Sequence, residues 1–185
     1  MQPILELYLT NWQLNAPHLL TSTATSSIYT VQHQGETVVL KLLNEIGAAD
    51  EGGGAIALDY WQGHGAVRLL RYDTQAHLLE YADGADLTKL VRQGDDSEAT
   101  RIIAGVLNQL HSTASPLPTD GLKPLHLWFR SLFHRAQQER HDEQATLFRQ
   151  GALVAEKLLA DPRDVRVLHG DIHHQNIRHK EGRGW

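Results

Sequence analysis

The chain has 185 residues, of which 41% are hydrophobic, so it can bury a core as one large domain or two small lobes. Its 17 Lys and Arg against 22 Asp and Glu give a net charge of -5, which argues against broad electrostatic binding to nucleic acid. It contains no cysteine, no basic N-terminal leader and no apolar run long enough to span a bilayer, so we expect no disulfide, signal peptide or membrane span. A soluble cytoplasmic protein is therefore expected.

The N-terminal part of the chain, over positions 1–80, is predicted to be rich in β-strand. Five short stretches have the composition of strands: 18–23, 27–33, 36–43, 66–73 and 76–82. A helix is expected between the third and fourth strands, beginning at Asp50 and Glu51, because carboxylates suit a helix N-terminus. This order of elements predicts a strand-rich N-terminal lobe over residues 1–80.

Beyond residue 84 the hydrophobic period becomes that of a helix. The stretch 97–111 places its apolar residues on one stripe. A loop with three prolines follows at 115–124, and two more helices are expected at roughly 125–140 and 143–160. The sequence therefore predicts an α+β fold with a hinge at 81–84 and a helical C-terminal lobe over 85–185.

The stretch LHGDIHHQNI at 168–177 holds the densest cluster of reactive side chains. The preceding VRVL is expected to form a short buried strand or bridge, and Ile177 resumes the apolar pattern. A loop held at both ends by the core fixes its polar groups. Asp171 and Asn176 suit phosphoryl transfer, because a carboxylate can accept the proton of an alcohol while an amide oxygen binds Mg²⁺.

The pattern H-G-D-x-x-x-x-N at 169–176 resembles the catalytic loop of aminoglycoside phosphotransferases and related small-molecule kinases. Lys41 lies on the third predicted strand, where such kinases keep the lysine that contacts the α- and β-phosphates. Glu51 is the candidate for its ion-pair partner, with Asp50 as the alternative. The stretches GHGAVRLLRYD and HLLEYADGADL resemble the streptomycin 6-kinase and hydroxyurea-resistance branch, and the resemblance covers about residues 10–185.

The resemblance implies a protein-kinase-like two-lobe fold. It implies an enzyme that transfers the γ-phosphoryl group of ATP, with Mg²⁺, to a hydroxyl of a small molecule such as a streptomycin-like aminoglycoside or hydroxyurea. Asp171 would be the base and Asn176 a Mg²⁺ ligand. The residues implied to bind the nucleotide are Lys41, Glu51, Ser26, Ser27, Glu80, Tyr81 and Ala82. The two serines would replace the usual glycines of the phosphate-covering loop, and residues 80–82 would carry the adenine on their backbone.

The kinase mechanism uses a further metal-binding aspartate on the strand after the catalytic loop, and none follows Asn176 in this sequence. On this ground we expect a truncated or degraded kinase with an incomplete C-terminal lobe. One alternative is a non-catalytic kinase-like nucleotide-binding module, a pseudokinase. Another is a zinc site on His169, His173, His174 and His179, although the four-residue spacing of His169 and His173 needs a helix and Gly170 argues against one. The oligomeric state and the identity of the acceptor are not predicted.

Overall fold

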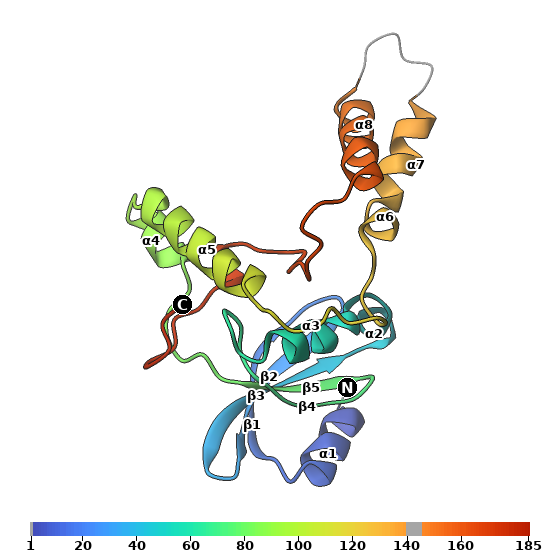
Figure 1. Ribbon diagram of the computed structural model, residues 1–185. Helices are drawn as coiled ribbons and strands as arrows, with labels where there is room; N and C mark the ends of the chain where they lie inside the picture. Colours follow the sequence, from blue (N-terminus) through green and yellow to red (C-terminus); the bar gives the residue numbers. More distant parts are fainter. Residues whose placement is uncertain (1, 140–145) are drawn as a thin grey trace. The chain divides into compact units, whose positions relative to one another are not determined.

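The computed structural model describes residues 2–139 and 146–185, with the side chains of Gln2 and Asp50 outside the described part (Figure 1). Two compact units are distinguished. The first combines Met1–Gly121 with Val167–Trp185, and the second is Leu122–Arg166. Every candidate site residue belongs to the first unit. The lobe boundary at 81–84 stays a prediction.

A five-stranded antiparallel sheet with the strand order β1-β2-β3-β5-β4 is the centre of the first unit. Its strands are β1 (Asn15–Ser22), β2 (Ser26–His33), β3 (Glu36–Leu43), β4 (Leu69–Tyr72) and β5 (Ala76–Glu80). Each overlaps one of the five predicted stretches. Gln34 and Gly35 join β2 to β3, and both have positive φ, as a type I′ hairpin turn requires. The predicted α+β class is confirmed.

One face of the sheet is covered by α1 (Gln2–Asn11), a helix that was not predicted from the sequence. Its Tyr8 packs in the main hydrophobic cluster with Leu40 and Leu42 of β3, and its hydroxyl donates to Asp73 Oδ1 at 2.8 Å. Burial and this bond raise the pKa of Tyr8 to about 12. Side chains alternate along a strand, so Lys41 points to the opposite face from Leu40 and Leu42.

The helical region after β3 starts earlier than predicted. Helix α2 spans Glu45–Glu51 and α3 spans Gly53–Trp61. The expected helix start at Asp50 and Glu51 is wrong, because Asn44 caps α2 by accepting a hydrogen bond from Gly47 N at 2.9 Å. Glu51 is therefore the last residue of α2. Helix α2 contacts β3 and α3 contacts β4, and both lie on the side of the sheet away from α1 (Figure 1).

The remaining helices agree in part with the prediction. In the first unit, α4 (Thr88–Arg92) is unpredicted and α5 (Asp96–His111) matches the stripe at 97–111. In the second unit, α6 (Leu125–Trp128), α7 (Arg130–Gln138) and α8 (Leu147–Ala160) stand where two helices were expected. The expected start of the last helix at 143 lies outside the described residues. Within the described ranges, no helix is long and apolar enough to cross a membrane.

The segment before the reactive loop differs from the prediction. Residues 162–169 contain no strand or bridge. Val167 is buried, but Val165 and Leu168 are 63% and 47% exposed, so the expected buried strand is wrong. Ile177 is buried as expected, and the short 3₁₀ helix His174–Asn176 precedes it. Asp86↔Arg178 and Lys180↔Gly184 are the isolated bridges of the described chain, and neither involves this segment.

Candidate active site

Lys41 and Glu51 form an ion pair on the sheet face opposite α1. The Lys41 Nζ lies 2.5 Å from Glu51 Oε2. Burial by itself raises the pKa of the Glu51 carboxyl, but hydrogen bonds from Lys41 and Thr25 outweigh it and hold the pKa below its usual range. The pair predicted from the sequence is therefore present, and the Glu51 carboxyl is charged at neutral pH. The side chain of Asp50, the alternative partner, lies outside the described part.

A buried histidine that was not predicted from the sequence stands beside this pair. His77 of β5 is the direct cross-strand partner of Lys41 and is only 3% exposed. Side chains of such partners share a face, with Cβ atoms about 4.5–5.5 Å apart. Burial lowers the pKa of His77 and Lys41 lowers it further, although Glu51 and Asp73 act in the opposite direction. The imidazole is therefore neutral at pH 7, and only the β3–β5 register reveals its position.

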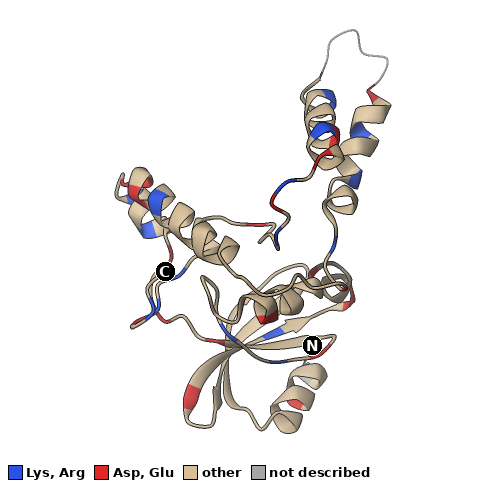
Figure 2. Cartoon of the chain, viewed as in Figure 1, with Lys and Arg blue, Asp and Glu red and all other residues tan. Residues whose placement is uncertain are grey.

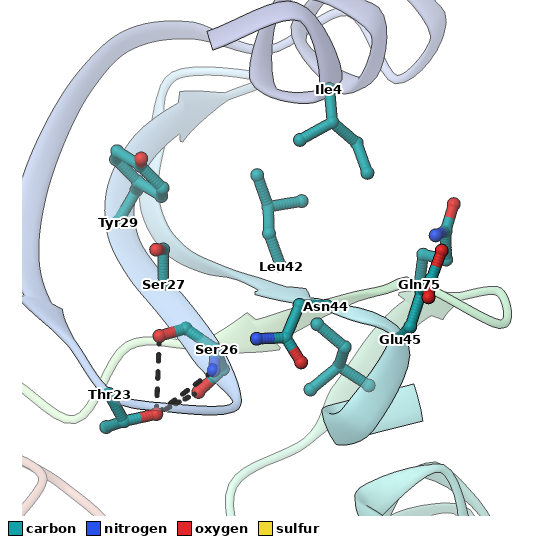
Figure 3. Close-up of a pocket in the computed structure, with 10 residues that line it drawn as sticks. Ile4, Thr23, Ser26, Ser27, Tyr29, Leu42, Asn44, Glu45 and Gln75 are labelled. Carbon is teal, nitrogen blue, oxygen red and sulfur yellow. Dashed lines mark hydrogen bonds between the residues drawn. The ribbon is translucent and has the colours of Figure 1, made fainter. Parts of the chain in front are cut away.

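The hairpin tip between β1 and β2 is held together by its own hydroxyl groups. Ser26 and Ser27 are buried, at 6% and 1% exposure. The Ser27 Oγ lies 3.1 Å from Ser22 Oγ. Thr23 Oγ1 lies 3.2 Å from Ser26 Oγ and accepts from Ser26 N at 3.0 Å (Figure 3). Both serine hydroxyls therefore contact other hydroxyl groups of the hairpin. Their role in phosphate binding stays a prediction.

The same hairpin tip lies against the start of α2. Asn44 Nδ2 donates to Ala24 O at 2.7 Å, and Asn44 N donates to Thr25 O at 2.9 Å. A Cβ on Gly47 would lie 2.2 Å from Thr25 O, so glycine is needed for this close approach. Because Glu51 is at the other end of α2 and also bonds to Thr25, the tip and the ion pair are parts of one packed region.

A cavity of about 220 Å³ lies beside this hairpin, and Thr23, Ser26 and Ser27 of the hairpin belong to its lining (Figure 3). Ile4 of α1, Tyr29 and Leu42 give it an apolar wall, and polar residues such as Asn44 stand at its edge. Its lining includes neither Lys41 nor Glu51. Tyr29 and Leu42 in its wall point to the α1 face of the sheet, opposite to Lys41.

Asp171 and Asn176 are brought together in the reactive loop. The Asn176 Nδ2 donates to Asp171 O at 2.8 Å and to Asp171 Oδ2 at 3.3 Å. No hydrogen bond within the described chain engages Asn176 Oδ1, which leaves the amide oxygen able to bind a cation. Gly170 has a φ of +80°, a conformation that glycine adopts without strain. The donor set thus fits a Mg²⁺ ligand next to an exposed carboxylate.

His169 braces this loop from its N-terminal side. Its Nδ1 accepts a hydrogen bond from Asp171 N at 3.3 Å, and its ring stacks on Trp61 of α3 at 6.3 Å between centroids. His169 is partly exposed, and burial of the rest of the residue lowers its pKa. The negative charge of Asp171 raises this pKa, and His173 lowers it further. A neutral imidazole can accept the bond from the loop backbone. In the described ranges, no three His, Asp or Glu side chains converge to hold a metal ion.

The predicted adenine-binding segment is bonded to the end of the chain. Glu80 Oε2 accepts from Arg68 N at 3.1 Å and pairs with Arg183. Tyr81 O accepts from Lys180 Nζ at 3.0 Å, and Ala82 O accepts from Arg178 Nε at 3.2 Å. Adenine binding at these residues stays a prediction. The structure thus joins the predicted residues in two pairs, Lys41 with Glu51 and Asp171 with Asn176, and no hydrogen bond among the described residues links one pair to the other.

Residues 11–185 match the family described as aminoglycoside/hydroxyurea antibiotic resistance kinase. The chain belongs to this family. The resemblance inferred from the reactive loop and Lys41 is confirmed, and the α+β structure described above is that of a member of a kinase family.

Curated relatives of this kinase family carry related names. The chain is 38% identical over 175 residues to a streptomycin 3''-kinase of Klebsiella pneumoniae, covering 94% of this chain and 62% of the relative. It is 35% identical over 133 residues to a streptomycin 6-kinase of Streptomyces griseus, covering 70% and 42%. It is 33% identical over 159 residues to a hydroxyurea phosphotransferase of Kitasatospora aureofaciens, covering 84% and 46%. The chain thus spans between 42% and 62% of the length of these relatives.

Proposed function

We propose that this chain carries the nucleotide-binding lobe, residues 1–80, and the catalytic loop, residues 169–176, of a small-molecule kinase. The reaction is transfer of the γ-phosphoryl group of ATP to a hydroxyl of an aminoglycoside such as streptomycin. The observation that carries this proposal is the Asp171–Asn176 pair in a member of a family of antibiotic resistance kinases. The names of the relatives, streptomycin kinases and a hydroxyurea phosphotransferase, support the acceptor class.

The phosphate-binding role falls to Lys41. Its ammonium group is held by Glu51 and stands on a rigid central strand, so little side-chain freedom is lost when it meets a phosphate oxygen. The neutral, buried His77 beside it adds no competing positive charge at pH 7. This arrangement supports binding of the α- and β-phosphates at the α2 side of the sheet.

The catalytic role falls to Asp171. Its exposed carboxylate can accept the proton of the acceptor hydroxyl, and the amide group of Asn176 holds it in place. Asn176 Oδ1 would hold Mg²⁺, which supplies charge neutralisation on the phosphates. Positioning and electrostatic stabilisation by these side chains account for most of the expected rate. Because ATP is the phosphoryl donor, we place this kinase in the cytoplasm.

The test uses protein expressed from the complete gene, with Mg²⁺-ATP and either streptomycin or hydroxyurea. Release of ADP and a mass gain of one phosphoryl group on the acceptor are the expected results. Nucleotide binding without transfer to any acceptor would instead support a non-catalytic kinase-like module. Absence of both binding and transfer would contradict the proposal altogether.

A further inference from the structure

The last segment of the chain lies beside the segment that leads from β5 into α4 (Figure 1). The Arg178 side chain donates from Nε to Ala82 O at 3.2 Å and from Nη2 to Gly84 O at 2.7 Å. Its guanidinium group thus bridges two carbonyl groups on nearby residues of that segment. The basic residues of this last segment appear in blue in Figure 2.

Backbone bonds reinforce the same contact. Gly84 N donates to His179 O at 2.9 Å, His179 N donates to Ala85 O at 3.1 Å, and Leu87 N donates to His174 O at 3.1 Å. We call residues 81–87 together with 174–180 the hinge latch. Lys180 adds a bond from its Nζ to a carbonyl of this latch, Tyr81 O.

The hinge latch is tightly packed as well as hydrogen-bonded. A Cβ on Gly84 would lie 2.5 Å from His179 O, so the two backbones approach as closely as glycine allows. Leu87 is fully buried and Ile177 is 5% exposed, so each of the two segments of the latch contributes a buried side chain. Two segments that are far apart in the sequence are therefore packed and hydrogen-bonded to each other.

The hinge latch connects a proposed Mg²⁺ ligand to the segment proposed to bind the nucleotide base. Asn176, the proposed Mg²⁺ ligand, lies shortly before Arg178 in the chain and is bonded on its other side to Asp171. Ala82, whose carbonyl accepts from Arg178, belongs to the segment proposed to bind the nucleotide base. Arg178 therefore links the Ala82 carbonyl to the chain segment that carries Asn176.

We propose that Arg178 is a positioning residue that couples nucleotide binding at residues 80–82 to the placement of Asn176. This inference rests on the proposed function. Arginine is needed because its planar fork reaches two carbonyl oxygens at once, whereas a lysine ammonium on a single stem reaches one. Occupation of the hinge by the nucleotide base then favours the Asn176 position that binds Mg²⁺, and bound Mg²⁺ favours the base-binding hinge in return.

The test compares Arg178→Lys and Arg178→Gln with wild type, all made from the complete gene. Arg101→Gln is the matched control, because Arg101 is an exposed arginine of α5 that bonds to Glu98. We measure the dissociation constant of ADP with and without Mg²⁺, the KM values for ATP and acceptor, and the melting temperature. The expected result for Arg178→Lys is a rise in the KM for ATP and in the Mg²⁺ concentration for half-maximal activity, each by roughly 5- to 20-fold. The KM for the acceptor should stay at the wild-type value.

A purely structural role gives a different pattern. In that case the Arg178 variants melt at a lower temperature, but the folded protein keeps the wild-type KM for ATP and the wild-type Mg²⁺ requirement. That pattern would overturn the proposed coupling. If Arg178→Gln does not fold, the Arg178→Lys protein decides the question. If wild type binds ADP but transfers no phosphoryl group, the proposed function fails while the ADP dissociation constants still decide the coupling. If wild type binds no nucleotide, both proposals are overturned.

Discussion

The ammonium group of Lys41 and the carboxylate of Glu51 lie 2.5 Å apart and join the central strand β3 to the last residue of α2. This pair sits at the C-terminal end of its helix, where a carboxylate gains nothing from the helix dipole. Its stability comes instead from Lys41 and from the hydrogen bond with Thr25 in the hairpin tip. The pair therefore depends on three elements, β3, α2 and the β1–β2 hairpin.

Replacement of Lys41 tests its phosphate-binding role. In protein made from the complete gene, Lys41→Ala should raise the KM for ATP and lower turnover by roughly 10²-fold, because a fixed positive charge at the phosphates is lost. Steady-state kinetics measure both quantities. Lys89→Ala on the exposed side of α4 serves as the control and should behave as wild type. Unchanged kinetics in Lys41→Ala would remove this residue from the site.

Replacement of Glu51 tests the ion pair through the pH dependence of stability. The pKa of Glu51 is lowered in the folded state, so the pair stabilises the fold above the ordinary value of 4.5. This stability is lost as the pH falls through the lowered pKa, where the carboxylate becomes protonated. Glu51→Gln should therefore melt at a lower temperature than wild type at pH 7 and at nearly the same temperature in strong acid. If the difference in melting temperature between Glu51→Gln and wild type is the same at every pH, the charge of Glu51 does not contribute to stability.

His77 should make the fold sensitive to mild acid. Its pKa is lowered from 6.5 by burial and by Lys41, so below pH 6.5 the unfolded chain takes up a proton that the folded chain does not. Stability should fall as the pH decreases from 6.5 toward the lowered pKa. Urea unfolding of His77→Gln should show a flatter pH dependence over this range, whereas His18→Gln on the exposed strand β1 should keep the wild-type slope. If stability depends on pH equally in wild type, His77→Gln and His18→Gln, His77 is not the group that makes the fold sensitive to acid.

Asp171→Asn tests the proposed base. The change keeps the shape of the side chain and removes the proton acceptor, so turnover of the complete gene product should fall by roughly 10²–10⁴-fold. The dissociation constant of ADP should stay at the wild-type value, because Asp171 is not in the nucleotide-binding set. Asp161→Asn, an exposed residue next to α8, is the matched control. Full turnover in Asp171→Asn would show that another group accepts the proton.

Purified protein should contain no stoichiometric zinc. The Nδ1 atoms of His169 and His173 already accept backbone hydrogen bonds from Asp171 and Gln175, each at 3.3 Å. These bonds leave one nitrogen on each ring, and no third ligand converges with them in the described residues. Elemental analysis measures the metal content. About one zinc per chain, lost in His169→Ala, would overturn the kinase-loop interpretation of the histidines.

The sequence by itself determined the features that depend on neighbouring residues. Short stretches with the composition of strands placed all five strands, and the Gln34–Gly35 turn joins β2 to β3. Asp171 and Asn176 meet because they are close in sequence within a short loop, so their contact needs little information from the rest of the chain. The ion pair between Lys41 and Glu51 was also predictable from the family resemblance, although the helix that carries Glu51 begins at Glu45, earlier than expected.

The tertiary structure decided the features that depend on residues far apart in the sequence. His77 becomes a neighbour of Lys41 only through the register of β3 with β5, and Arg178 reaches Ala82 across 96 positions. The segment around Val165 has strand-like composition but no strand, because a strand needs a partner that supplies its hydrogen bonds and none of the described strands pairs with it. Local propensity cannot encode such pairings, since the energy that selects them comes from burial and hydrogen bonds made after distant segments have met.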